Sequence, residues 1–192
     1  AANRLRNTRP TAVNLFWALD RMERKFETSR LDLRPRSKNI VRVSPSASLG
    51  INFASRKHNV AIAQLKKIIL KEALDILEED KKMCAAIGRN GARLIKNGDV
   101  ILTHCNAGIL ATVGQGTALS ILYEAKNQGK RFKVYADETR PLMQGSRLTM
   151  WELMENRIDA VLICDDMAAS AIKNKGVTKI IVGADRIARN GD

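Results

Sequence analysis

Cys105 and Asp185 are the residues of this 192-residue chain whose type and setting best suit chemistry. Cys105 follows an apolar run and precedes the small residues 106–108, where a ligand can approach the backbone closely. A thiol is activated beside a helix N-terminus or a cation. Asp185 closes a second apolar run, and a carboxyl at the mouth of an apolar cleft can serve as acid or base. Together they suggest a proton-moving pair. On spacing alone, however, a buried structural cysteine in a tight turn is favoured, and Asp185 could cap a helix or pair with Arg186.

The elements that must position these residues alternate in type along the second half of the chain. Short β-type runs are predicted at residues 99–105, 132–137, 160–165 and 179–185. Helical patterns lie between them at residues 117–128, 146–156 and 167–175. Strands separated by helices of this length form βα units on a parallel sheet. We therefore predict an α/β fold, with a Rossmann-like parallel sheet and flanking helices over residues 98–192.

Each predicted strand ends in a reactive or charged residue, namely Cys105, Asp137, Asp165 and Asp185. Ligands of open α/β sheets bind at the carboxyl ends of the strands, so these residues should share one rim. Residues 136–153 add Glu138, Arg140, Gln144 and Arg147 to that rim. The Gln144 amide could bind a sugar hydroxyl. His104 is predicted to be a hydrogen-bonded strand-end histidine, and His58 receives no role.

The first half, residues 1–97, is predicted to be a helical N-terminal domain. Residues 8–22 indicate an amphipathic helix, and Arg9 just before it could face a phosphate. Residues 30–59 contain two prolines and several serines with weak periodicity, which favours an irregular basic insertion. From residue 60 to residue 95 the helical period returns with a charged outer face, typical of a solvated support helix.

The net charge of +13 is concentrated rather than spread. Residues 30–58 hold seven Lys or Arg against one Asp, which gives +6 there and leaves 13 − 6 = +7 for the rest. Aromatic residues make up only 4% and do not interleave with the basic ones, which argues against a nucleic-acid surface. An RNA-binding segment confined to this stretch is the minority alternative.

Cofactor and compartment signals are also informative. The three cysteines lack metal-ligand spacing, so we expect reduced thiols, a cytoplasmic protein and no metal. Neither a GxGxxG after a strand nor a GxxxxGK[ST] is present, so no dinucleotide or ATP is indicated. No apolar run approaches membrane-spanning length. Small-residue loops, helix starts and scattered arginines fit a phosphosugar enzyme without a cofactor.

Four blocks carry a resemblance to a known family: TRPTAVNLFWALDRM, THCNAGILATVGQGTAL, ADETRPLMQGSRLTMWEL and IIVGADRIARNGD. They closely resemble the methylthioribose-1-phosphate isomerases, which share a superfamily with the alpha, beta and delta subunits of translation initiation factor 2B. The resemblance covers residues 1–29 and about 60–192. It implies an aldose–ketose isomerase, an intramolecular oxidoreductase of methionine salvage that converts 5-methylthioribose 1-phosphate to 5-methylthioribulose 1-phosphate.

The same resemblance implies roles for individual residues. Asp185 would be the proton donor, and Cys105 would stabilise the transition state or exchange the proton. Arg9 and Gln144 would bind substrate. No metal or cofactor takes part in the family reaction, and the family implies a homodimer formed through the α/β domain.

Two related groups offer alternatives. Non-catalytic initiation-factor subunits resemble the chain in fold but lack the cysteine and aspartate pair. Ribose-1,5-bisphosphate isomerases keep the pair but lack the TRPTAVNL block and the LATxGxGTAL continuation. The chain also departs from the family pattern, because an RGAPAIG-type phosphate loop and a later Asn-Lys pair are absent. We therefore expect a fragment whose sheet is truncated at the C-terminus and which is inactive alone.

Overall fold

The computed structural model describes residues 2–8, 13–33 and 51–191. Its internal contacts divide the chain into two compact units, Ala1–Ile76 and Leu77–Asp192. We expected the helical region to give way to the α/β domain after residue 97. The division instead falls inside a long helix, because the last turns of that helix pack with the sheet-bearing unit.

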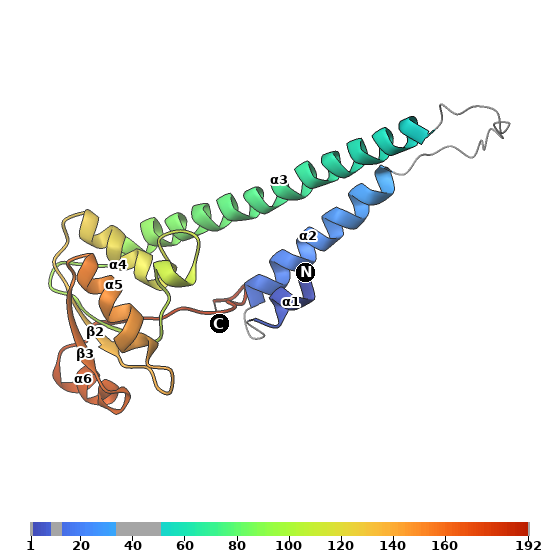
Figure 1. Ribbon diagram of the computed structural model, residues 1–192. Helices are drawn as coiled ribbons and strands as arrows, with labels where there is room; N and C mark the ends of the chain where they lie inside the picture. The colour runs from blue at the N-terminus through green and yellow to red at the C-terminus, as the bar shows by residue number, and fades with distance from the viewer. Residues whose placement is uncertain (1, 9–12, 34–50, 192) are drawn as a thin grey trace, which may run out of the picture. The chain divides into compact units, whose positions relative to one another are not determined.

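The first unit is helical, as the apolar spacing predicts. Its helices are α1 (Ala2–Arg6), α2 (Val13–Asp32) and the first part of α3 (Ile51–Ala92) (Figure 1). Arg6 of α1 pairs with Asp20 and Glu23 of α2. Arg21 of α2 donates to the largely buried Glu72 of α3 at 2.6 Å. Ion pairs therefore link α1 to α2 and α2 to α3 within this unit.

The predicted irregular insertion over residues 30–59 is partly wrong. Helix α2 continues to Asp32 and α3 begins at Ile51, so both ends of that stretch are helical. No glycine or proline occurs between Ile51 and Ile87, and therefore nothing in the sequence stops the later helix from extending backwards. Residues 34–50, the rest of the predicted insertion, lie outside the described part of the chain.

The second unit contains the predicted parallel sheet. Its strands are β1 (Val100–Thr103), β2 (Lys133–Asp137), β3 (Asp159–Ile163) and β4 (Lys179–Ile181). All neighbours pair in parallel, in the order β3-β2-β1-β4. The chain steps outward from β1 to β3 and then crosses to the other side of β1. The sheet therefore has a topological switch point between β1 and β4, as in doubly wound folds.

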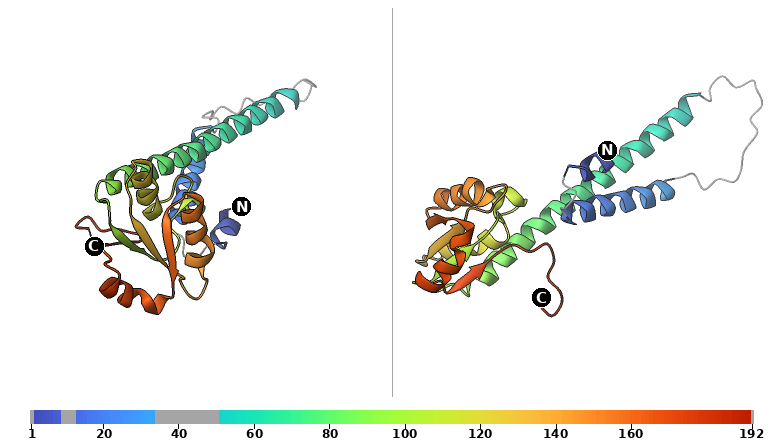
Figure 2. Two further views of the ribbon diagram at one scale, coloured as in Figure 1. Left: turned by 90° about the vertical axis from the view of Figure 1, so that its left-hand side faces the viewer. Right: turned by 90° about the horizontal axis from the view of Figure 1, so that it is seen from below.

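Helices cover both faces of this sheet, which confirms the Rossmann-like arrangement (Figure 2). The end of α3, α4 (Ala118–Asn127) and α5 (Met150–Glu155) pack on one face. Helix α6 (Ala168–Asn174) packs on the other face, against Leu102 and Ile163. The side chains of Ile101 and Leu102 enter opposite layers because successive strand residues alternate between faces. Three short helical segments complete the unit: η1 (Ile109–Ala111), η2 (Gly145–Thr149, a π-helix) and η3 (Asp165–Met167).

No helix in the described ranges is long and apolar enough to cross a membrane.

Candidate active site

Cys105 and Asp185, two of the predicted site residues, follow the two strands that flank the switch point of the sheet. Cys105 follows β1 by two residues, and Asp185 follows the neighbouring strand β4 by four. The Thr103 hydroxyl donates to the Ile181 carbonyl oxygen at 2.8 Å and ties the ends of these two strands together. In open α/β sheets the crevice beside such a point is the usual ligand site. Because β1 and β4 are parallel neighbours, both chain segments leave the sheet at the same edge.

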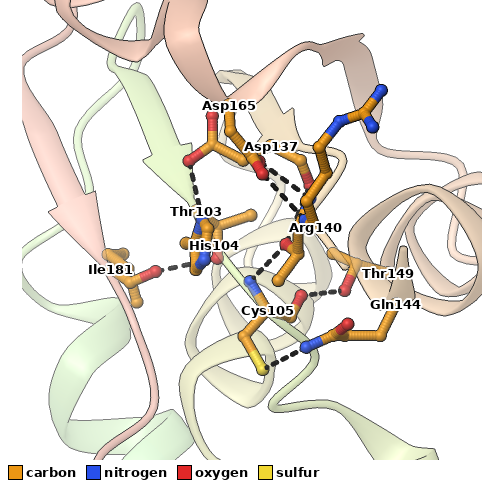
Figure 3. A network of polar contacts seen from close by, with 10 residues as sticks. Thr103, His104, Cys105, Asp137, Arg140, Gln144, Thr149, Asp165 and Ile181 are labelled. Carbon is orange, nitrogen blue, oxygen red and sulfur yellow. Dashed lines mark hydrogen bonds and ion pairs between the residues drawn. The ribbon is translucent and has the colours of Figure 1, made fainter. Parts of the chain in front are cut away.

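Cys105 is exposed and its backbone adopts an unusual conformation. Its φ of +67° lies in the left-handed region, which costs a non-glycine residue on the order of 1 kcal/mol. Two threonine hydroxyls bind its peptide groups (Figure 3). The Cys105 N–H donates to Thr139 Oγ1 at 2.9 Å, and Thr149 Oγ1 donates to the Cys105 carbonyl at 2.5 Å. The surrounding structure thus fixes the direction in which the thiol leaves the chain.

Gln144 is the predicted residue that the structure brings to Cys105. Its Nε2 lies 3.2 Å from Sγ and donates to it (Figure 3). The other amide atom, Oε1, is buried and has no hydrogen-bond partner among the described residues. The next residue must be glycine, because a Cβ on Gly145 would lie 1.8 Å from the Asp137 carbonyl oxygen. The Gln-Gly pair therefore lets the amide approach the rim closely.

A buried carboxylate, which sequence reasoning missed, organises the loop after Cys105. Glu152 of α5 is 1% exposed and accepts four hydrogen bonds. Its oxygens take Asn106 Nδ2 at 3.0 Å, the Tyr123 hydroxyl at 2.7 Å, and the backbone N–H groups of residues 109 and 110 at 2.7 and 3.4 Å. Burial, reinforced by this carboxylate, raises the pKa of Tyr123 far above its usual range.

The same carboxylate explains one of the small residues in the loop. A Cβ on Gly108 would lie 2.0 Å from Glu152 Oε2, so only glycine fits there. The helical pattern of residues 146–156 gave no sign of this role, because a glutamate in MWELME resembles an ordinary solvent-facing charge.

His104 is hydrogen-bonded, as predicted. Its Nδ1 lies 3.0 Å from Asp137 Oδ2, and the Asp137 carboxyl is buried, with no hydrogen-bond partner for Oδ1 in the described part of the chain. Burial raises the pKa of Asp137, and His104 offsets part of that rise. Asp165 accepts the N–H groups of Arg140 and Thr139, which lower its pKa. Ligand atoms of His104, Asp137 and Asp165 lie within 4.8 Å of one another. Both Asp165 oxygens already bind backbone amides, so we assign this group to turn geometry rather than to a metal.

No hydrogen bond or ion pair among the described residues holds the Asp185 side chain beside Cys105. The strand ends at Ile181, earlier than the predicted residue 185, and Asp185 is exposed. No other described residue is hydrogen-bonded to its side chain. Gly183 packs on the loop after Cys105, since a Cβ there would lie 2.8 Å from Ala107 Cβ. Gly183, two residues before Asp185, therefore lies against the loop that follows Cys105.

The remaining predicted residues are placed differently. Arg9 lies outside the described residues. Arg140 pairs with Glu138 at 2.9 Å, and the exposed Arg147 donates to the Leu142 carbonyl at 3.2 Å. Two described cavities, of about 310 and 550 Å³, are lined only by residues of α2 and α3. Neither is lined by a predicted site residue, so the chemistry of the sheet rim is the better guide to the site.

Comparison with known proteins agrees with these observations. The profile of the Initiation factor 2 subunit family matches residues 1–192. The chain is 48% identical over 188 residues to a methylthioribose-1-phosphate isomerase of Thermosipho melanesiensis, which covers 98% of this chain and 46% of the relative.

Two solved structures are similar to the chain over almost its whole length. The 5-methylthioribose 1-phosphate isomerase from Pyrococcus horikoshii superposes with a TM-score of 0.72 at 36% identity, covering 100% of this chain and 46% of that one. The delta subunit of translation initiation factor eIF-2B from A. fulgidus gives a TM-score of 0.69 at 42% identity, covering 97% and 46%. The chain spans about half the length of the curated relatives it matches. It belongs to the Initiation factor 2 subunit family.

Proposed function

We propose that this chain supplies the reactive cysteine and aspartate of an aldose–ketose isomerase. The substrate is 5-methylthioribose 1-phosphate, the product is 5-methylthioribulose 1-phosphate, and the reaction belongs to methionine salvage. One observation carries the proposal: an exposed Cys105, clamped by two threonines and hydrogen-bonded by Gln144, stands at the switch point of the sheet. The names of close relatives support the reaction class.

The reaction sets clear demands on the site. The phosphate on C1 blocks spontaneous ring opening, so the ring oxygen must gain a proton as the ring opens. The hydrogen on C2 then moves to C1, and the C2 hydroxyl loses its proton as it becomes the ketone. No external oxidant or reductant is consumed. The enzyme must therefore provide a proton donor and a group that stabilises or exchanges the moving hydrogen.

Asp185 suits the donor role because its carboxyl has no competing partner among the described residues. Cys105 suits the second role because its side chain is exposed and already accepts a hydrogen bond from Gln144. The unpaired Oε1 of Gln144 favours an added role in binding a substrate hydroxyl, since a buried acceptor without a donor is costly. Arg9 would bind the phosphate.

We further propose that the protein acts as a cytoplasmic homodimer without a cofactor and without nucleic acid. Three reduced-type cysteines, of which Cys84 is buried and Cys105 and Cys164 are exposed, support a reducing compartment.

A non-catalytic regulatory subunit is the second candidate, favoured by the likeness to the A. fulgidus delta subunit. Turnover separates the two. The protein encoded by the longest natural open reading frame that contains residues 1–192 should be purified and incubated with 5-methylthioribose 1-phosphate. Formation of the ketose is then followed by proton NMR. If the protein is an isomerase, the reaction should proceed until the aldose and the ketose are at equilibrium. Binding of the sugar phosphate without any ketose would support the regulatory subunit instead. Parallel incubation with 5-deoxyribose 1-phosphate shows whether the methylthio group is recognised.

A further inference from the structure

We infer that Thr139 and Thr149 are positioning residues that hold the Cys105 thiol in its reactive direction. Both are almost fully buried, 3% and 1% exposed, although each carries a hydroxyl. They come from different elements, the turn after β2 and the end of η2. Each binds one of the two backbone polar groups of Cys105, so the residue is held at its N–H and its carbonyl at once.

The proton positions in this clamp follow from chemistry. A carbonyl oxygen can only accept, so Thr149 must donate its single hydroxyl proton to Cys105. The Thr149 oxygen then accepts from Asn106 Nδ2 at 3.2 Å. Thr139 accepts the Cys105 N–H and donates to the Asp137 carbonyl at 3.2 Å. Each hydroxyl thus acts as donor and acceptor, and neither can rotate without losing a bond.

Further contacts anchor the clamp itself. Thr139 also has a left-handed backbone, with a φ of +64°, and its N–H donates to Asp165 Oδ1 at 2.8 Å. On the other side, Asn106 links Thr149 to the buried Glu152 carboxylate. Two left-handed residues are therefore held from both sides, as expected for a conformation that only the surrounding structure maintains.

The clamp has a direct consequence for the thiol. The contact between Gln144 Nε2 and Sγ depends on the Cys105 backbone keeping its present φ. Removing either hydroxyl lets Cys105 relax toward an ordinary conformation and turns Sγ away from Gln144. The thiol then no longer keeps the orientation in which Gln144 contacts it, so its reactions should slow. Threonine suits the task better than serine, because its branched Cβ restricts χ1.

Alkylation of Cys105 by iodoacetamide tests the inference without any substrate. The longest natural reading frame is used, and peptide mass spectrometry resolves Cys105 from other cysteines. We expect Thr149→Val to slow alkylation of Cys105 by about tenfold at neutral pH, and Thr149→Ser to restore most of the rate. Thr178→Val is the matched control: it removes a hydroxyl that is bound to Asp99 Oδ1 at 2.9 Å, before β4 and outside the clamp. That variant should react at the wild-type rate.

A second measurement covers the case in which Thr149→Val does not fold. Thr139→Val removes the acceptor of the Cys105 N–H, so hydrogen exchange at that amide should accelerate by at least about tenfold, while amides of β2 stay protected. Wild-type alkylation in Thr149→Val, or wild-type amide protection in Thr139→Val, would overturn the inference.

The catalytic consequence rests on the proposed function. There, Thr149→Val should lower kcat by about 10- to 100-fold with little change in KM, because the thiol is misplaced while substrate-binding groups remain. A positioning role would be contradicted if Thr149→Val and Thr149→Ser changed kcat and KM to the same extent. Absence of turnover in the wild type, with the alkylation pattern as expected, would defeat the proposed function and leave the clamp standing.

Discussion

Replacing Glu152 by glutamine should destabilise the α/β unit, although the two side chains have nearly the same shape. All four partners of the carboxylate are donors: Asn106 Nδ2, the Tyr123 hydroxyl and the N–H groups of Ile109 and Leu110. A glutamine keeps one acceptor oxygen and turns an NH₂ group toward the other pair. Tyr123 can rotate its hydroxyl and accept, but a backbone N–H cannot. At least one N–H of this part-buried cluster therefore loses its acceptor.

The size of the effect follows from these contacts. An unsatisfied buried donor costs about 1–3 kcal/mol, and hydrogen bonds to a neutral acceptor are weaker than those to a carboxylate. Removal of a buried charge returns part of its desolvation cost, so the four bonds do not simply add. We expect Glu152→Gln to lower the free energy of unfolding by about 2–4 kcal/mol.

Urea denaturation followed by far-UV circular dichroism measures this difference. Glu155→Gln is the matched control, since Glu155 lies on the same helix, is exposed and should change stability by no more than about 0.5 kcal/mol. If Glu152→Gln unfolds at the same urea concentration as Glu155→Gln, the loop after Cys105 does not depend on the Glu152 carboxylate.

Three further predictions concern the rim, the strand ends and the thiols. Gly145→Ala should lower the free energy of unfolding by at least about 3 kcal/mol, because its Cβ would lie 1.8 Å from the Asp137 carbonyl oxygen. Gly98→Ala is the comparison in the same urea assay: its Cβ would have no atom within 4 Å, and only its φ of +85° is unfavourable, so it should cost about 1 kcal/mol. Burial of Asp99 is outweighed by Lys179 Nζ at 2.7 Å and by the donors of residues 96 and 178, so the pKa of Asp99 is lowered. A lowered folded-state pKa gives stability that is present above the unfolded-state pKa and is lost as the pH falls through the folded-state pKa. Between about pH 5 and pH 2, urea midpoints should therefore fall less steeply with decreasing pH in Asp99→Asn than in wild type. Equal slopes in the two proteins would contradict this. Burial, together with Asp80, raises the pKa of the Cys84 thiol, so iodoacetamide should modify Cys84 only after unfolding, and rapid native-state labelling would show the burial to be wrong.

The sheet was predictable because each strand and helix has a strong local pattern. Short β-branched runs separated by helical periods leave few alternatives to parallel βα units, and all four strands occur where expected. That the residues after the strands share one edge of the sheet was also predictable, since the carboxyl ends of parallel strands meet at one edge. The strand order was not predictable, because no local pattern indicates that β4 pairs with β1 rather than with β3.

The polar network around Cys105 could not be predicted from the sequence, for a different reason. Thr139, Thr149 and Glu152 are single polar residues whose partners lie 29 to 46 positions away along the chain. A buried glutamate and an exposed one look the same in a helical pattern. The irregular stretch failed in the opposite way: composition suggested a loop up to residue 59, while the helix begins at Ile51 because no glycine or proline interrupts it.

The proposed isomerisation of 5-methylthioribose 1-phosphate depends on Cys105 and Asp185. Cys105→Ser and Asp185→Asn should be made in the longest natural reading frame, with Cys164→Ser and Asp166→Asn as exposed controls from the same unit. Turnover is followed by NMR, and affinity for the sugar phosphate is measured by calorimetry. We expect both site variants to lose at least about 1,000-fold in kcat while affinity stays within about fivefold, and both controls to resemble wild type. Wild-type turnover in either site variant would contradict it.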